Sequence, residues 1–298
     1  MKMKDKKGAT KEFQTLYPYN DETKKSLVEF RNQPLKTIHI DGVNWYYFVT
    51  GRAERAVLFL HGMAGAYDIW WQQIKVLKQD YKIISVTYPP LDSLQKIGTA
   101  LIKILKKENI KKINLVGSSL GGYIAQFMVA TYPGKIEKAV FANTFPPNDL
   151  FEKQNKKLIR ILPFLPERLI RYKFRRNLMK TVIPASQYSG RVKAYLLEWS
   201  YERMSKKQLI ARYRCVIGKF NPADPGHNIP LMLIESANDP LIPPELRAEL
   251  KKLYTFRTIY TFQDKGHFPY LNDPETYTGV IGSFLGDAGR SVYRIKKT

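Results

Sequence analysis

Short apolar runs alternate with longer segments of helical periodicity along most of this chain. The runs at 56–60, 113–116, 139–142 and 231–236 are dominated by apolar residues, as expected of strands that are buried on both faces of a sheet. Between the first two, residues 92–109 place apolar side chains three or four positions apart, which is typical of an amphipathic helix. The pattern therefore predicts an α/β fold in which helices cover a mostly parallel central sheet.

The order of these segments predicts one core interrupted by an insertion. We expect a hairpin and then alternating strands and helices, at 35–41, 43–50, 56–60, 67–77, 81–88, 92–109, 113–116, 120–131 and 139–142. The alternation resumes after residue 230, at 231–236, 244–254, 258–262 and 274–285. In between, the chain shows helical segments rich in Arg, Lys, Tyr and Leu. We predict an N-terminal extension (1–34), an α/β core (35–145 and 228–298) and a helical cap inserted at 146–227.

Composition excludes several classes of protein. The chain has 298 residues, of which 44% are hydrophobic, so it can bury a large core and lacks the signature of disorder. Its single cysteine, Cys215, excludes an intramolecular disulfide and a multi-cysteine zinc site, and it fits a reducing compartment. Five lysines lie in residues 1–11, but no signal-peptide core follows them, and no apolar run is long enough to span a membrane. We therefore expect a cytoplasmic protein.

The charge by itself does not identify a partner. There are 49 Lys+Arg against 26 Asp+Glu, a formal net charge of +23, which fits a nucleic-acid partner, an anionic membrane surface or a Lys-rich composition. No nucleic-acid-binding module is evident, so we expect no specific nucleic-acid partner. Residues 149–226 hold 18 Lys+Arg and 6 Asp+Glu, so half of the excess lies in the predicted cap. Its basic, apolar stretch 159–178 predicts either weak association with an anionic membrane or a cap helix with solvated arginines.

The strongest chemical motif is the sequence GSSLG at 117–121, where a buried strand runs into a helix. This is the G-x-S-x-G pattern, which presents a serine on a turn so tight that Gly117 and Gly121 must be small. We therefore predict that Ser119 is a nucleophile. A serine needs a base to accept its proton, and the base needs a partner to orient it.

Of the four histidines, His267 is the best candidate for the base, because it follows the last predicted strand. Asp239 follows the strand 231–236 and is the best candidate for the acid, although an Asp before Pro is also a common helix start. Glu235 is the alternative acid. Asp264 and Asp273 are less suitable candidates, because they are too close to His267 in sequence. The serine, acid and histidine then occur in the order of the G-x-S-x-G hydrolases.

The glycine-containing segment HGMAGA at 61–66 follows the strand 56–60, so its free backbone N–H groups are expected near the same strand ends. We predict that the amides of Met63 and Leu120 form an oxyanion hole, and that His61 and Gly62 hold this loop. An ordinary strand-to-helix turn is the alternative interpretation.

Together these four segments resemble the α/β-hydrolase superfamily, over about residues 35–285, with the insertion where that family places its cap. Within it the chain is most similar to the maspardin-like branch, through Gly65, the segment DIWWQQI at 68–74, Tyr88-Pro89, the segment SLGG at 119–122 with Ala125-Gln126, and the segment FPYL at 268–271. That branch implies a binding scaffold, whereas the retained His61-Gly62 and His267 favour an active enzyme.

The sequence thus predicts a serine hydrolase acting on a small-molecule carboxylic ester of small or medium acyl length. The resemblance implies a Ser-His-Asp mechanism without cofactor or metal, while a serine at position 119 speaks against a dehalogenase or epoxide hydrolase, which use Asp there. Two alternatives stay open, namely a maspardin-like scaffold without catalysis and a basic peripheral membrane-binding protein. The oligomeric state and the identity of the ester are left open by the sequence.

Overall fold

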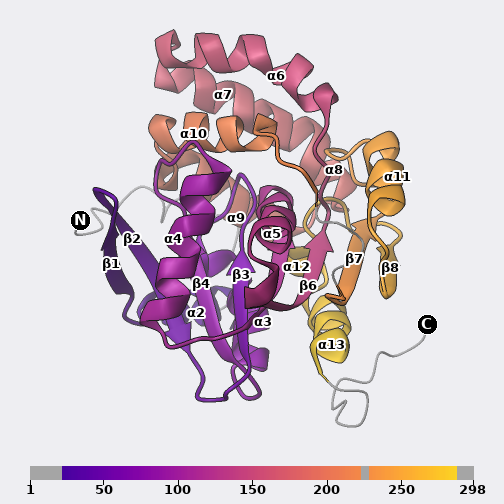
Figure 1. The fold of residues 1–298 in the computed structure, drawn as a ribbon. Coiled ribbons are helices and arrows are strands. Elements are labelled where there is room, and N and C mark those ends of the chain that lie inside the picture. The colour runs from indigo at the N-terminus through magenta and orange to yellow at the C-terminus, as the bar shows by residue number, and fades with distance from the viewer. Residues whose placement is uncertain (1–21, 223–227, 287–298) are drawn as a thin grey trace.

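In the computed structural model, which describes residues 22–222 and 228–286, eight strands form one sheet in the order β1-β2-β4-β3-β5-β6-β7-β8 (Figure 1). The pairs β1–β2 and β2–β4 are antiparallel and every later pair is parallel, so the predicted mostly parallel sheet is confirmed. The strands are β1 Lys36–Ile40, β2 Val43–Thr50, β3 Ala56–Leu60, β4 Lys82–Thr87, β5 Ile113–Ser118, β6 Ile136–Ala142, β7 Leu231–Ser236 and β8 Thr258–Phe262.

The sheet is buried on both faces because its central strands are apolar at successive positions. In β3, Val57 and Phe59 pack into one hydrophobic cluster, while Leu58 and Leu60 pack into another on the opposite face. One face is covered by α4 (Leu94–Lys107), α5 (Leu120–Thr131) and α11 (Pro244–Leu253), and the other by α3 (Trp71–Leu77) and α13 (Pro274–Leu285) (Figure 1).

Between β6 and β7 the described chain is helical, as the loss of strand pattern predicts. We call residues 149–217 the cap; it contains α6 Asp149–Ile161, η3 Leu162–Phe164, α7 Glu167–Asn177, the π-helical η4 Leu178–Val182, α8 Ile183–Ala185, α9 Gly190–Glu198, the π-helical η5 Trp199–Arg203 and α10 Lys206–Ile217. Figure 1 shows α6, α7 and α10 gathered at one end of the sheet. The division into extension, core and inserted domain stays a prediction.

Part of the predicted N-terminal extension packs against the core. Residues 1–21 lie outside the described residues. Helix α2 (Glu22–Arg31) buries Leu27 and Phe30 in the hydrophobic cluster on the face of the sheet that α3 covers. The ring of Phe30 lies 4.7 Å from that of Phe48 in β2. The sequence pattern did not single out this helix, because a short helix with two buried apolar residues carries little periodic signal.

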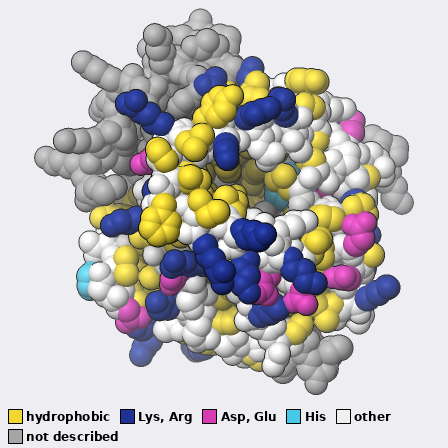
Figure 2. Space-filling view, turned by 90° about the horizontal axis from the view of Figure 1, so that it is seen from above, with side chains coloured by type: hydrophobic (Ala, Val, Ile, Leu, Met, Phe, Trp, Pro, Cys, Tyr) yellow, Lys and Arg dark blue, Asp and Glu magenta, His cyan; other side chains and the backbone are white. Residues whose placement is uncertain are grey.

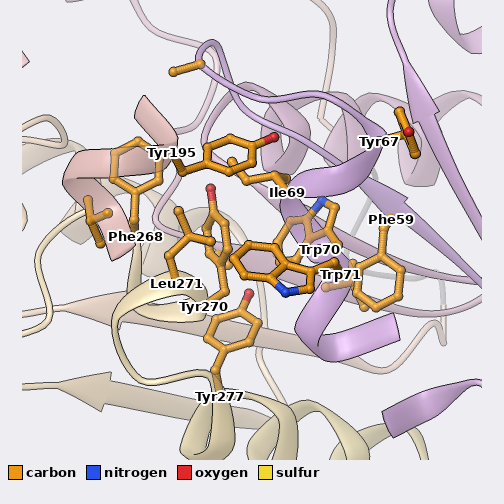
Figure 3. Close-up of a cluster of buried hydrophobic side chains, with 14 of the residues drawn as sticks. Phe59, Tyr67, Ile69, Trp70, Trp71, Tyr195, Phe268, Tyr270, Leu271 and Tyr277 are labelled. Carbon is orange, nitrogen blue, oxygen red and sulfur yellow. The ribbon is translucent and has the colours of Figure 1, made fainter. Parts of the chain in front are cut away.

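An aromatic cluster joins two of the segments that carry the maspardin-like resemblance. Trp70, in the one-turn helix η1 (Tyr67–Trp70), lies 4.3 Å from the ring of Tyr270, in α12 (Pro269–Asn272), and 5.2 Å from that of Phe59 (Figure 3). Gln73 donates to the Tyr270 carbonyl at 2.9 Å. These tryptophan and tyrosine side chains are buried in the core, so they act in packing. Within the described ranges, no helix has the length and apolar content needed to cross a bilayer.

Candidate active site at the strand ends

Ser119 occupies the turn between β5 and α5. Its backbone has φ 57° and ψ −122°, a conformation that residues other than glycine rarely adopt. Its amide donates to the carbonyl of Ala142, the last residue of β6, at 2.9 Å, and its carbonyl accepts from the Thr144 hydroxyl at 2.8 Å. Two bonds to the end of β6 and the segment after it thus hold the turn. The strained backbone is therefore fixed from a neighbouring strand, and the side chain lies at the wall of a cavity.

The glycines on either side of Ser119 allow the backbones to approach closely. A Cβ on Gly117 would lie 2.2 Å from the carbonyl oxygen of Gly121. A Cβ on Gly121 would lie 2.0 Å from the carbonyl oxygen of Leu60, in the neighbouring strand β3. Any side chain at these two positions would force β3, β5 and α5 apart, because the contacts are with backbone atoms.

His267 and Asp239 form a buried pair at the ends of β8 and β7. The Nδ1 atom of His267 lies 2.8 Å from Oδ2 and 3.0 Å from Oδ1 of Asp239. Burial alone would raise the pKa of Asp239, but His267 and the hydrogen-bond donors around the carboxylate outweigh it and hold the pKa below its usual value. Asp239 is thus ionised at neutral pH and orients His267 with Nδ1 toward the core.

A third side chain supports this carboxylate. Asn143 follows β6 with φ 41° and donates from Nδ2 to Oδ2 of Asp239 at 2.9 Å. The backbone amides of Leu241 and Ile242 donate to Oδ1 at 2.9 and 3.3 Å. The carboxylate therefore orients the histidine and also accepts from two amides of the turn that follows it. The alternative interpretation, that Asp239 starts a helix, is wrong, because α11 begins at Pro244 with Pro243 as its N-cap.

The other acids considered from the sequence lie in different surroundings. Glu235 forms an ion pair with Lys251 at 2.6 Å, and Asp264 accepts a hydrogen bond from Gln187. Asp273 caps α13 by accepting from the amide of Thr276. In the part of the chain that the structure describes, Asp239 is the carboxylate that pairs with His267.

The loop after β3 lies beside Ser119. A Cβ on Gly62 would lie 3.0 Å from the Cβ and 3.6 Å from the Oγ of Ser119, so the backbone of this loop comes within reach of the serine hydroxyl. His61 is buried, and its Nδ1 lies 2.7 Å from the Gly62 carbonyl. Burial lowers the pKa of His61 well below its usual value, and the charge of Arg212 lowers it further, so His61 is neutral. Leu120 begins α5, where the first N–H groups have no partner within the helix.

A cavity of about 400 Å³ joins these residues to the cap. Ser119, His267, Gly62 and Met63 line its core side, and apolar residues of the cap form most of the remaining wall: Phe151, Leu158, Leu162, Leu165, Ile170, Phe174, Leu178, Val182, Leu209, Tyr213 and Val216. Figure 2 shows a hollow on this face, bordered by apolar side chains with Lys and Arg around them. Such a volume and lining suit a small or medium-sized apolar ligand.

Ser119 and His267 face this cavity together, but within the described residues no hydrogen bond joins them. Catalytic hydrogen bonds are often long before substrate binds and shorten in the complex with substrate. The described ranges contain no group of three or more His, Cys, Asp or Glu side chains placed to hold a metal ion.

Two site residues were missed by sequence reasoning. Asn143 lacks a motif, although a polar residue directly after a buried strand is a usable signal for this edge of the sheet. Arg212 lies in α10, yet it is only 2% exposed and donates to the loop that contains Met63. No local pattern distinguishes it from the exposed arginines of the cap, because its burial depends on where α10 docks.

Comparisons with known proteins identify the fold family of this chain. The model of the family described as alpha/beta hydrolase fold matches residues 99–274. Maspardin from Danio rerio is 23% identical over 250 residues, which cover 80% of this chain and 78% of that protein. The uncharacterized hydrolase YugF from Bacillus subtilis is 21% identical over 270 residues, covering 85% of this chain and 98% of that protein.

Solved structures show the same fold at low sequence identity. A hydrolase from Pseudomonas aeruginosa has a TM-score of 0.71 and 18% identity, and the match covers 86% of this chain and all of that one. A meta-cleavage product hydrolase from Pseudomonas fluorescens has a TM-score of 0.68 and 18% identity, with 85% and 98% of the two chains covered. The resemblance read from the sequence is confirmed at the level of the fold and of maspardin-like relatives.

Proposed function

Because the chain belongs to the α/β-hydrolase fold family, we propose that it is a serine hydrolase that cleaves carboxylic esters through Ser119, His267 and Asp239. The observation that carries this proposal is the convergence of a strained serine and a carboxylate-paired histidine on one cavity. Each group comes from a different strand end, and structural packing alone does not require a nucleophile, a base and an acid to meet there.

In the proposed reaction, Ser119 Oγ attacks the carbonyl carbon of the ester while His267 Nε2 accepts its proton. Asp239 stabilises the imidazolium that forms, and the amides of Met63 and Leu120 donate to the oxyanion. Collapse of the tetrahedral intermediate releases the alcohol, which takes the proton from His267. Water then attacks the acyl-enzyme by the same route and regenerates Ser119.

The cavity supports an ester with an apolar acyl group of small or medium size. Its wall near Ser119 is largely apolar, and Leu158, Phe174 and Leu209 reach it from three different cap helices. Burying each CH₂ of an acyl chain against such a wall contributes about 0.8 kcal/mol. We therefore expect kcat/KM to rise with acyl length until the cavity is full, and then to fall.

A fluorophosphonate probe and a panel of p-nitrophenyl esters from acetyl to dodecanoyl test this proposal. The wild type should be labelled and should turn over esters, and Ser119→Ala should do neither. Ser118→Ala is the matched control, since Ser118 is buried in β5 and does not line the cavity; it should keep labelling and turnover. Lack of labelling in the wild type, or equal labelling of Ser119→Ala, would overturn the proposal and favour a maspardin-like binding role.

A specific surface of the cap supports a second role, association with an anionic membrane. Phe164, between α6 and α7, is 86% exposed, and Ile161 of α6 and Leu169 and Tyr172 of α7 are exposed too. Lys206 donates to the carbonyls on either side of Phe164 at 2.7 Å, which fixes this corner of the cap. Exposed aromatic and aliphatic side chains beside basic ones suit the interface of an anionic bilayer.

Vesicle sedimentation tests this second role. Binding to phosphatidylserine vesicles but not to phosphatidylcholine vesicles is expected, with a loss at high salt. Phe164→Glu should weaken it at least several-fold, whereas Ile259→Glu, on the exposed face of β8, is the control for an added charge. Equal binding of Phe164→Glu and wild type, or no binding to either vesicle, would refute this role for the cap.

A further inference from the structure

Arg212 is a buried cation that the proposed reaction does not yet use. Its Nη1 atom donates to the carbonyl of Met63 at 2.6 Å and to that of Gly65 at 3.0 Å. Its guanidinium lies 5.1 Å from the ring of Trp199 and 5.9 Å from that of Tyr88. Among the described residues no carboxylate forms an ion pair with it. Burial lowers the pKa of Arg212 to about 10, so it stays charged at neutral pH.

A buried charge without a carboxylate partner is costly, and carbonyl dipoles with aromatic faces compensate only part of that cost. Replacing a buried charge by an apolar residue of similar volume is often neutral or stabilising, so stability alone does not favour an arginine at position 212. The placement of an arginine there points to a role in the loop that it contacts.

That loop is a tight turn in which the carbonyls of Gly62, Met63 and Gly65 accept hydrogen bonds. The amide of Gly65 donates to the carbonyl of Gly62 at 3.2 Å, which closes a turn of four residues. Nδ1 of His61 donates to the same carbonyl at 2.7 Å, and Nε2 of His61 accepts from the amide of Tyr88 at 3.4 Å, which sets the tautomer of the neutral ring. Arg212 donates to two further carbonyls of the turn, those of Met63 and Gly65.

The direction of the Met63 amide follows from these contacts. The Gly62 carbonyl and the Met63 N–H belong to one planar trans peptide, so they point in opposite directions. Because His61 and Gly65 fix the carbonyl, the N–H is turned away from them, and Gly62 itself lies next to Ser119. The turn keeps the Met63 N–H in this orientation as long as its remaining carbonyls stay in place.

We propose that Arg212 is a positioning residue, through which cap helix α10 fixes the turn 62–65 so that the Met63 amide meets the oxyanion formed at Ser119. This inference rests on the proposed hydrolase function. Its guanidinium charge, placed against the same turn, also favours the negative charge that develops in the transition state. The cap is then part of the catalytic machinery as well as a wall of the cavity, because the oxyanion hole is complete only when α10 is docked.

The test compares Arg212→Met, Arg212→Lys and the control Arg214→Met, all in α10. Arg214 is about half exposed and pairs with Asp92 at 2.9 Å, away from the turn. Active enzyme is counted by titration with a fluorophosphonate, and kcat and KM are measured on one ester. Loss of a whole oxyanion donor lowers kcat by about 100- to 1000-fold. In Arg212→Met the donor is misplaced and not removed, so we expect a smaller loss, of about 10- to 100-fold in kcat. KM should stay within about threefold of the wild-type value.

Arg212→Lys keeps a charge and a donor, so it should recover part of the lost kcat, and Arg214→Met should match wild type. A trifluoromethyl ketone, whose adduct carries an oxyanion, should lose affinity in Arg212→Met in parallel with kcat. If Arg212→Met does not fold, Arg212→Gln replaces it, and we again expect a lower kcat with little change in KM.

Wild-type kcat in a folded, neutral variant at position 212 would overturn the positioning role, as would a change confined to KM or to thermal stability. Failure of the hydrolase proposal is distinguishable, because wild type would then show neither titration nor turnover. An active wild type with an insensitive position 212 refutes only the inference about Arg212.

Discussion

Replacing Asp68 by Asn should strongly destabilise the fold, because this fully buried carboxylate joins three parts of the chain. It accepts from Arg31 of α2 at 2.5 Å, from Arg203 of η5 at 2.6 Å and from the Tyr195 hydroxyl of α9 at 2.7 Å. Burial would raise the pKa of Asp68, but the charges of Arg203 and Arg31 outweigh it and hold the pKa well below its usual range. Removing the charge leaves two guanidinium groups facing each other.

The expected magnitude follows from the surroundings of the two arginines. Breaking a buried ion pair by removing one partner costs about 3–5 kcal/mol. The side chains of Arg31 and Arg203 are 14% and 19% exposed, and Arg31 keeps two hydrogen bonds of 2.8 Å to Glu198, so part of this cost is relieved. We expect Asp68→Asn to lower the free energy of unfolding by about 2–4 kcal/mol, which is roughly a 4–16 °C drop in Tm.

Thermal and urea unfolding, followed by circular dichroism, measure this change. Asp92→Asn is the matched control, because Asp92 is 38% exposed and pairs with Lys96 and Arg214 at the surface; it should cost at most about 1 kcal/mol. Arg203→Met in the Asp68→Asn background should restore part of the stability by removing the unpaired cation. A loss below about 1 kcal/mol for Asp68→Asn would refute the assignment of this network as a structural anchor of the cap.

The same network predicts a pH dependence of known sign. Because the pKa of folded Asp68 is depressed, its stabilisation is complete above the unfolded pKa of about 4 and is lost as pH falls through the folded pKa. The difference in unfolding free energy between wild type and Asp68→Asn should therefore be constant from pH 5 upward and shrink below about pH 4. A difference that grows on acidification would contradict this sign.

Two further predictions concern the site. Gly62→Ala places a methyl group 3.0 Å from the Cβ and 3.6 Å from the Oγ of Ser119, so ester turnover should fall by at least about tenfold; unchanged turnover in a folded variant would show that the loop does not adjoin the reacting atoms. Asp239→Asn keeps the shape of the acid but removes the charge that orients His267, so kcat should fall by about 10³–10⁴-fold. Steady-state rates above a tenth of wild type would refute that role.

The strands and core helices were predictable because their signals are local. The strands at 56–60, 231–236 and 258–262 agree with the structure. For the first and second of these, a run of apolar residues between turn residues specifies a buried strand without reference to the rest of the chain. The helix expected over 67–77 is instead a single turn of η1 followed by α3. Helix α2 was not foreseen, since the burial of a residue such as Phe30 depends on contact with the distant β2.

Within the site, the sequence by itself determined which residues stand at strand ends, and thereby brought Ser119, Asp239 and His267 to one edge of a parallel sheet. Only the tertiary structure decided which acid faces the histidine, and it placed Asp239 there while Glu235 pairs with Lys251. The physical reason is that chain order and turn chemistry act within a few residues. The burial of a charge such as Arg212 or Asp68, in contrast, depends on surfaces that meet only when the cap docks on the core.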